Sequence, residues 1–584
     1  MTAPAISRPS AARRIFRGYG PLVVFALLFL LMAAFVPSVD EQEVNAGAGG
    51  AGGGTGGLFG PESTTDATTV ADPAAGDPAA AGDPAADPAA AGGDPAAAGG
   101  GAPAAGGGGG GAAGGGGGGT AGGGAQAAGG VQKCTDRDKQ IPGDPYSPPC
   151  LIFKGDNGGA TAKGVTPTEI IVSSRILDEK GFQQTLAALA GAEITDRPED
   201  VRRTITAIAE YLNKRMNFYG RQLKVEFYNG KGSGTAELLG GGQAEAEADA
   251  VTSADQIKAF AEINGGTPPF SDALARKKVI AFGAPYLSRE WMMKRRPYNW
   301  SISTDCSIIS ESGSEFSVKQ LAGKNAEFAG PGLQGQPRKF GILAPENPWY
   351  QECVQAAKNI VKKAGQPEPQ SIAYKLDINS MSNQAASVIA KLKSEGITTV
   401  TCGCDPIFPV FLSAKAQEQG YNPEWIVVGT AFTDIDLVGQ LYDQTQWSRA
   451  FGISYLGPTL PLRAGLGYAA YKSVRQDEPA FAVESIYAQM YMLGLGIHMA
   501  GPNLTPETYE QGMFNYPGGT GPFGTWGFDQ DSYTPTQDYR VIWWDPKKTS
   551  GQNGKQGSYV ESYGGKRFPA GKLPSEDPKV FGRQ

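Results

Sequence analysis

Histidine is almost absent from this sequence of 584 residues, which contains only His498. Enzymes with a Ser or Cys nucleophile mostly need a base whose pKa lies near neutral, and histidine usually supplies it. His498 stands in an apolar helical stretch, which favours a buried structural role. The count excludes His-rich zinc sites, and the sequence has no nucleophile elbow, Walker loop or zinc-ligand spacing. We therefore predict a protein that is not an enzyme and uses no cofactor or metal.

An excess of basic residues is also lacking. The 51 Lys and Arg residues are outnumbered by 58 Asp and Glu, which gives a net charge of -7. Nucleic-acid-binding proteins usually carry a basic patch or stripe. We therefore expect no nucleic-acid partner.

Positive charge is missing on one side of an apolar run at residues 21–36. Four arginines precede this run, and no Lys or Arg follows it until Lys133. Such asymmetry places the amino terminus on the cytoplasmic side of the membrane and the rest of the chain outside. The run is borderline between a cleaved signal peptide and a membrane span. Because no clear cleavage site and no lipid-attachment Cys follow it, we favour an uncleaved signal anchor; Arg13-Arg14 leaves a twin-arginine signal as an alternative.

Residues 45–130 consist mostly of Gly, Ala, Pro and Asp, with a repeated Asp-Pro-Ala-Ala unit followed by poly-Gly. Such a segment has too little apolar side chain to offset the entropy of ordering it. As a flexible coil of this length it has an end-to-end distance on the order of 50 Å. The sequence therefore predicts a disordered stalk that holds an extracytoplasmic head away from the membrane.

Six cysteines occur on the exported side, and an even number there favours three disulfides. Cys134 and Cys150 bracket a Pro-rich loop and are predicted to pair, which contributes roughly 3 kcal/mol. For the other four, the preferred prediction joins Cys353 to one member of the Cys402-Gly-Cys404 pair and Cys306 to the other. A redox or metal role for Cys402 and Cys404 is disfavoured because redox motifs usually have two intervening residues.

From Val165 onward, predicted strands alternate with predicted helices. The strands are at 169–174, 222–228, 279–282, 339–343, 398–402 and 426–429. The helices are at 201–218, 254–263, 350–364, 384–395 and 409–419. This alternation indicates an α/β fold with parallel sheets covered by helices on both faces. Ligands of such sheets bind at the carboxyl ends of the strands.

Several stretches, in this order along the chain, resemble the type I periplasmic binding proteins, which are the branched-chain amino-acid and amide receptors of ABC importers. The stretches are Lys214–Leu223 with its Tyr-Gly-Arg-Gln-Leu ending, Ile263-Asn-Gly-Gly-Thr-Pro-Pro-Phe-Ser271, Lys278-Val-Ile-Ala-Phe-Gly-Ala284, Pro345-Glu-Asn-Pro-Trp-Tyr350 and Gln419-Gly-Tyr-Asn-Pro-Glu-Trp-Ile-Val-Val-Gly429. The resemblance covers about residues 165–550.

The resemblance implies two Rossmann-like lobes with a ligand cleft between them, joined by three crossovers. Helix 483–499 would return to the first lobe, and 524–544 would form a terminal hairpin. The implied divisions are 1–40 for the signal or anchor helix, 41–130 for the linker, 131–164 for the Cys-bracketed loop, 165–300 for the first lobe, 301–445 for the second, 446–550 for the segments that complete both, and 551–584 for a tail.

The resemblance also implies the ligand-binding residues. In the first lobe, hydroxyl groups and backbone N–H groups at a helix start would hold a carboxylate or amide. The matching positions there are Ser174, Arg175, Gly265, Gly266, Thr267, Ser271, Ala284 and Tyr286. The second lobe would supply an aromatic lid and an acidic partner for an ammonium group. The matching positions there are Trp349, Tyr350, Asp405, Thr430 and Asp434.

Two positions depart from the family pattern: Gln351 replaces the usual Gly, and Thr430 stands where amino-acid binders have Glu. The second departure weakens the case for an amino-acid ligand. The expected function is a receptor that captures a small polar solute (an amino acid, amide or short organic acid) and delivers it to an ABC permease. The alternative is a membrane-tethered sensor, or a scaffold, with the same fold.

Overall fold

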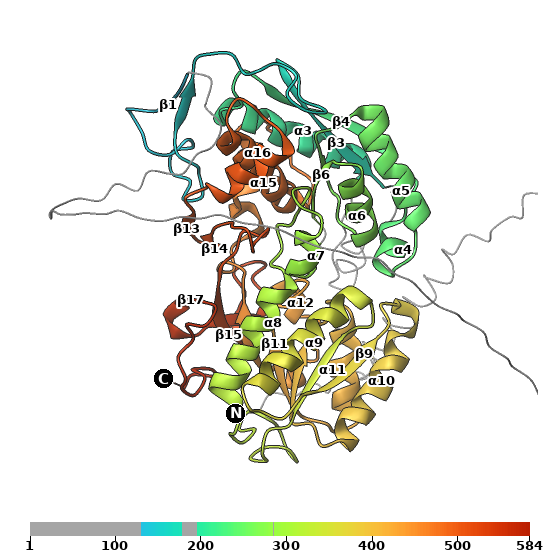
Figure 1. Cartoon of the computed structure of the whole chain (residues 1–584). Helices are drawn as coiled ribbons and strands as arrows, with labels where there is room; N and C mark the ends of the chain where they lie inside the picture. Colours follow the sequence, from blue (N-terminus) through green and yellow to red (C-terminus); the bar gives the residue numbers. More distant parts are fainter. Residues whose placement is uncertain (1–129, 178–195, 284, 584) are drawn as a thin grey trace, which may run out of the picture. The chain divides into compact units, whose positions relative to one another are not determined.

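The computed structural model of the protein describes residues 130–177, 196–283 and 285–583 (Figure 1). The predicted anchor helix, the predicted stalk and Ala284 lie outside these residues. Among the helices of the described ranges, none is long and apolar enough to cross a lipid bilayer.

The first lobe is built on a parallel sheet with the strand order β4-β3-β5-β6-β7. Ile170 and Val172 of β3 are fully buried, as is the whole of β5. Burial on both faces also explains why β6 is apolar at every position. The strands are β3 (Glu169–Ile176), β4 (Gln222–Asn229), β5 (Ala261–Ile263), β6 (Ile280–Phe282) and β7 (Asn299–Trp300).

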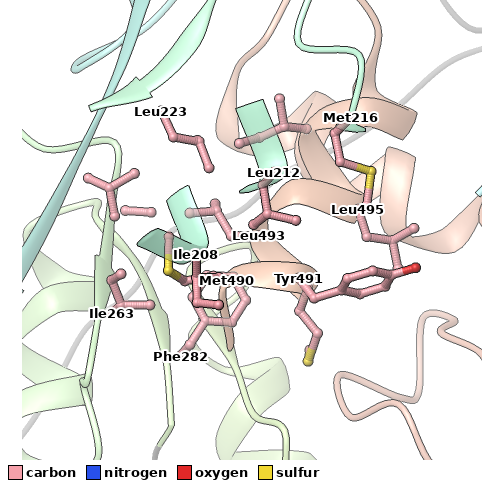
Figure 2. Close-up of a cluster of buried hydrophobic side chains, with 14 of the residues drawn as sticks. Ile208, Leu212, Met216, Leu223, Ile263, Phe282, Met490, Tyr491, Leu493 and Leu495 are labelled. Atoms are coloured by element: carbon pink, nitrogen blue, oxygen red, sulfur yellow. The ribbon is translucent and has the colours of Figure 1, made fainter. Parts of the chain in front are cut away.

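Helices cover both faces of this sheet. In α3, Ile205, Ile208 and Leu212 recur at helical spacing and are fully buried. Figure 2 shows the Ile208 and Leu212 side chains among those of Met490 and Leu493 from α15, a helix far away in sequence. The helices are α3 (Pro198–Arg215), α4 (Gly234–Leu238), α5 (Gln243–Val251), the π-helical turn η1 (Thr252–Ile257), α6 (Pro268–Arg276), α7 (Arg289–Met293), α14 (Leu466–Lys472), α15 (Val483–Ala500) and α16 (Pro506–Phe514).

The second lobe has a mixed sheet with the order β16-β15-β12-β11-β10-β8-β9, and β17 also pairs with β15. The strands from β8 to β12 run parallel, whereas β15, β16 and β17 add antiparallel pairs. The strands are β8 (Phe340–Pro345), β9 (Gln370–Tyr374), β10 (Thr399–Cys402), β11 (Glu424–Val427), β12 (Ala450–Ser454), β15 (Asp538–Thr549), β16 (Gln556–Glu561) and β17 (Arg567–Pro569).

Separate apolar cores lie on the two faces of this second sheet. Figure 1 shows α8 and α9 next to each other beside it. The helices are α8 (Cys306–Phe316), the π-helical turn η2 (Ser317–Leu321), α9 (Pro348–Lys363), α10 (Ile378–Ser394), α11 (Phe408–Glu418), α12 (Asp436–Gly439), α13 (Gln444–Trp447) and the short 3-10 turns η3 (Leu462–Ala464) and η4 (Tyr563–Gly565).

The chain passes from the first sheet to the second after β7, returns after β12, and passes back before β15. Two small hairpins complete the described elements. They are β1 (Val131–Lys133) with β2 (Leu151–Phe153), and β13 (Gly519–Gly521) with β14 (Gly524–Trp526). Parallel strands linked by helices therefore build both lobes, and antiparallel strands extend the second.

One local prediction was wrong and another holds only in part. The helix expected at 254–263 ends with η1, because Lys258 adopts a left-handed conformation (φ 60°) and Ala261–Ile263 pairs as a buried strand with β3 and β6. The terminal hairpin expected at 524–544 forms only over its first part, where Trp526 bridges Thr536 in antiparallel fashion, whereas β15 pairs with β12. In both cases tertiary pairing overrode local propensity.

His498 is fully buried and holds the Cys-bracketed loop against α15. Its Nδ1 accepts a hydrogen bond from the Asn217 N–H at 3.2 Å, and its Nε2 lies 2.9 Å from the Pro149 carbonyl oxygen. Burial lowers the pKa of His498 to about 4. The predicted structural role is confirmed, as is the predicted disulfide between Cys134 and Cys150.

We predict that His498 makes the fold sensitive to acid. Since its pKa in the folded state lies below the usual 6.5, the unfolded chain binds the proton more tightly, and stability falls as the pH drops from 6.5 towards 4. Urea denaturation at about pH 7.5 and pH 5 measures how much unfolding free energy is lost on acidification. This loss should be about 2 kcal/mol smaller in His498→Gln than in the wild type. An identical pH dependence in the variant would assign the acid sensitivity to other groups.

Candidate functional site

A cavity of about 150 Å³ lies in the second lobe between one face of the sheet and helices α8 and α9. Its lining runs from Phe340 and Pro369, at the amino ends of β8 and β9, to Gly403 and Thr430, beyond the carboxyl ends of β10 and β11. Tyr286, which follows β6 of the first lobe, also lines it. The cavity therefore reaches the boundary between the lobes. It does so beyond the carboxyl ends of the strands, which is where parallel α/β sheets bind ligands.

Four of the residues expected in the cleft line this cavity: Tyr286, Tyr350, Asp405 and Thr430. Asp405 follows β10, and its carboxylate accepts hydrogen bonds from the Tyr374 hydroxyl at 2.6 Å and from the N–H of Ile407 at 2.8 Å. Burial raises the pKa of the Asp405 carboxyl. Burial also raises the pKa of Tyr350 to about 12, so its phenol is neutral at physiological pH. Tyr286, Tyr350, Asp405 and Thr430 lie where the cavity reaches the first lobe, and we call this part of the lining the cavity mouth. The mouth thus combines two neutral phenols with one half-buried acid.

The other two residues expected in the second lobe lie beside this cavity and are not part of its lining. Asp434 is buried and accepts a hydrogen bond from the Ser454 hydroxyl at 2.6 Å, while its Oδ1 has no partner within the described ranges. Burial raises the pKa of Asp434. Trp349 packs against the core of the first lobe, near Gly240. The start of α9 therefore touches the opposite lobe.

Two disulfides contribute to the cavity lining, and their pairing differs from the prediction. Cys306 pairs with Cys353, and Cys402 pairs with Cys404. The first bond joins the start of α8 to the first turns of α9, with a Cα–Cα distance of 5.8 Å. The second closes directly after β10, where the Cα atoms are 5.0 Å apart. Both Cα–Cα distances suit a disulfide. The prediction that Cys306 and Cys353 would each pair with Cys402 or Cys404 was therefore wrong.

Arg175 is held by acidic residues in the first lobe. Its guanidinium pairs with both oxygens of Glu237, at 2.8 and 3.0 Å, and with Asp249 at 3.3 Å. All three side chains are at most 2% exposed. The guanidinium also lies over the Phe270 ring, 3.6 Å from its centre. The positive charge of Arg175 is therefore neutralised by acidic groups of the protein itself.

The first-lobe hydroxyls expected to hold a carboxylate also have partners in the protein. The Thr267 hydroxyl donates to Glu237, and the Ser271 hydroxyl donates to the Gly265 carbonyl. The first two positions of α6 are Pro268 and Pro269, which have no N–H. Exposed N–H groups at the start of a helix bind anions. The start of α6 therefore offers an anion fewer donors than most helices do.

The two remaining first-lobe positions lie in the same region. The Ser174 hydroxyl accepts a hydrogen bond from the Asn264 amide at 3.2 Å. Gly266 lies against the backbone of Gly283, next to the end of β6. Neither position brings a positive charge to the site.

Three buried acids of the first lobe were not among the residues expected from the sequence: Glu237, Asp249 and Glu262. The Glu262 carboxylate accepts hydrogen bonds from the Ser173 hydroxyl and, at 2.6 Å, from the Arg175 N–H. Burial raises its pKa to about 7. Glu262 could have been found from the sequence, because it is a lone acid between the apolar residues Ala261 and Ile263. Glu237 and Asp249 gave no such signal, because acidic residues are common in exposed helices.

Residues 198–553 match the family model described as periplasmic binding protein, and this range is more than half of the chain. The chain belongs to the periplasmic binding protein family. Members of this family are non-enzymatic solute-binding receptors of ABC transporters, and membership implies an extracytoplasmic location.

Solved structures similar to this periplasmic binding protein include receptors with different ligands. An R. palustris solute-binding protein in complex with 4-hydroxybenzoate is 13% identical, covers 70% of this chain and 98% of its own, and has a TM-score of 0.48. A branched-chain amino acid binding protein of Streptococcus pneumoniae in complex with isoleucine is 14% identical, covers 68% and 100%, and has a TM-score of 0.44. A substrate-binding protein of Aeropyrum pernix is 15% identical, covers 69% and 96%, and has a TM-score of 0.47. No curated protein matches the sequence significantly.

We predict that Arg175 is essential for the stability of the first lobe. Arg175→Met leaves the buried carboxylates of Glu237 and Asp249 without their cation, which should lower the free energy of unfolding by about 3 to 5 kcal/mol. The control is Arg276→Met, because Arg276 is exposed and its ion pairs with Glu247 and Asp272 lie at the surface, where such a pair contributes less than about 1 kcal/mol. Urea denaturation followed by circular dichroism measures both. Equal losses in the two variants would contradict the prediction.

The disulfide between Cys306 and Cys353 should be the more stabilising of the two at the cavity. It closes a loop of 47 residues, so replacing both cysteines by Ala should cost about 4 kcal/mol of unfolding free energy. The matched double variant at Cys402 and Cys404, which are separated by 2 positions, should lose only about 1 kcal/mol. Mass spectrometry of a non-reduced digest checks the pairing directly, and a peptide linking Cys353 to Cys402 or Cys404 would refute it.

Proposed function

We propose that this periplasmic binding protein captures a small solute between its lobes and delivers it to an ABC importer. The observation that carries the proposal is the cavity mouth. Tyr286 from the first lobe and Tyr350, Asp405 and Thr430 from the second line one cavity, although they lie far apart in sequence. A mainly apolar cavity with a few convergent polar groups is the usual form of a small-molecule site.

The family resemblance implies a small polar solute, such as an amino acid, an amide or a short organic acid. The buried charges around the site distinguish among them. Asp405 and Asp434 lie at the cavity or beside it, and Arg175 is already paired with acids. A solute carboxylate therefore meets little positive charge, which favours an amide or an amine over an organic acid.

The amino-terminal segment bears on the location of the receptor in the cell. We propose that the apolar run at 21–36 anchors the chain in the membrane and that the Gly- and Ala-rich segment at 45–130 tethers the receptor outside it. A tethered receptor stays close to its permease, so each captured solute has a short way to travel. The same tether also suits a membrane-bound sensor, which is the second candidate function.

A thermal-shift screen with amino acids, amides and short organic acids tests capture. A ligand at about 100 times its Kd stabilises the protein by about 2.7 kcal/mol, which raises Tm by a few degrees. Tyr350→Ala should abolish the shift, whereas Phe481→Ala, which removes a half-exposed ring, should preserve it. If neither a solute of the panel nor a small amine raises Tm, capture is refuted.

Uptake of the identified solute separates the receptor from the sensor. Cells that lack the chain should take up the labelled solute several-fold more slowly than cells that produce it, and Tyr350→Ala should not restore uptake. Binding without any effect on uptake would refute delivery and support the sensor.

A further inference from the structure

We infer that the solute is a small amphipathic amine, whose compact apolar body enters the cavity of the second lobe while its positively charged head stays at the mouth beside Asp405. This inference rests on the proposed function and names the chemical class of its ligand. The site it uses extends behind the boundary between the lobes, into the second lobe itself.

The cavity is suited to an apolar body. Its volume of about 150 Å³ is similar to that of an apolar cavity that binds benzene. The inner part is lined by apolar side chains, among them Ile309, Ile342, Val354 and Val428. A ring or a short branched alkyl group can therefore fill this space, where it would replace missing van der Waals contacts.

The cavity exists because α8 presents small residues to the sheet. Ser310, Gly313 and Ser314 line it, and the two serine hydroxyls donate to the α9 carbonyls of Cys353 and Ala357, at 2.9 and 3.4 Å. The hydroxyls are therefore satisfied by protein acceptors and add little polarity to the wall. The disulfide between Cys306 and Cys353 fixes the spacing of the two helices at the mouth.

The charge of the ligand's polar head is inferred from the ionisable groups at the cavity mouth. Asp405 is the only ionisable acid or base, apart from the two tyrosines and the disulfide cysteines, among the residues that line the cavity in the described part of the chain. Its two backbone donors and the Tyr374 hydroxyl are neutral, so none of the described residues places a cation at hydrogen-bond distance from the carboxylate. Asp434, whose Oδ1 has no partner within the described ranges, is a second buried acid beside the cavity. The charges of Arg540 and Arg567 reach Asp434, but these two arginines are hydrogen-bonded to Glu561 and Asp538. An ammonium group would supply the missing positive charge.

The first lobe disfavours a carboxylate for the same reason. The Arg175 guanidinium is committed to Glu237 and Asp249, and the Thr267 hydroxyl donates to Glu237. Two prolines remove N–H donors from the start of α6. The wall that would have to hold an acid thus carries more buried negative charge than positive.

Benzylamine and benzoate test the inference, because they share a ring and differ in the charge of the head. Titration calorimetry on the full chain at neutral pH should show saturable binding of benzylamine, and binding of benzoate at least about 100-fold weaker. Asp405→Asn keeps a side chain of the same shape and should reduce the preference for benzylamine at least about 10-fold. Equal or tighter binding of benzoate overturns the inference.

Filling the cavity tests where the ring lies. Ala357→Leu places a larger side chain in the cavity and should abolish benzylamine binding while the unliganded protein remains folded. Ala390→Leu is the matched control, because Ala390 is an exposed position on α10, and it should bind benzylamine as the wild type does. Unchanged binding in Ala357→Leu overturns the inference.

The outcomes separate this inference from the proposed function. If an amino acid, amide or organic acid of the thermal-shift panel binds and benzylamine does not, the amine is wrong and the receptor stands. If neither benzylamine nor any solute of the panel binds, the inference and the proposed function both fail.

Discussion

Parallel pairing of strands is the constraint on which the site depends. In both lobes the pairing brings the carboxyl ends of neighbouring strands to one edge, so that loops from distant parts of the sequence meet there. Asp405 after β10 and Thr430 after β11 become neighbours of Tyr350 at the start of α9 in this way. The antiparallel strands β15, β16 and β17 extend the second sheet on the side of β12, away from β9. They therefore leave this arrangement unchanged.

The same edges concentrate buried acids, which is costly unless each acid is paired or hydrogen-bonded. The first lobe meets this cost with Arg175, which neutralises part of the charge of Glu237 and Asp249. In the second lobe Asp405 accepts hydrogen bonds only from neutral donors, as Glu262 does in the first lobe. Asp434 accepts from the Ser454 hydroxyl and also lies within reach of the charges of Arg540 and Arg567. Asp405 therefore leaves negative charge that a ligand can balance.

The alternation of strands and helices could be predicted from the sequence because apolar spacing is local. The helix around Ile205, Ile208 and Leu212 and the strand that begins at Glu169 were found within a few residues of their bounds. The strand Ala261–Ile263 was missed because three residues carry no periodic signal, and only burial between β3 and β6 defines it. The cysteine pairing failed for a related reason. Sequence spacing does not tell which helices pack side by side, and it was the packing of α8 on α9 that joined Cys306 to Cys353.

By itself the sequence determined the composition of the chain: one histidine, a net negative charge, a one-sided apolar segment and an α/β pattern that resembles a receptor family. These properties depend only on residue types and short-range order. The tertiary structure decided which polar groups remain available to a ligand. Arg175 and Thr267 match ligand-binding positions in the sequence, yet both are bonded to Glu237 in the fold. Such pairing depends on distances between residues far apart in the chain, and those distances are fixed only when the lobes are packed.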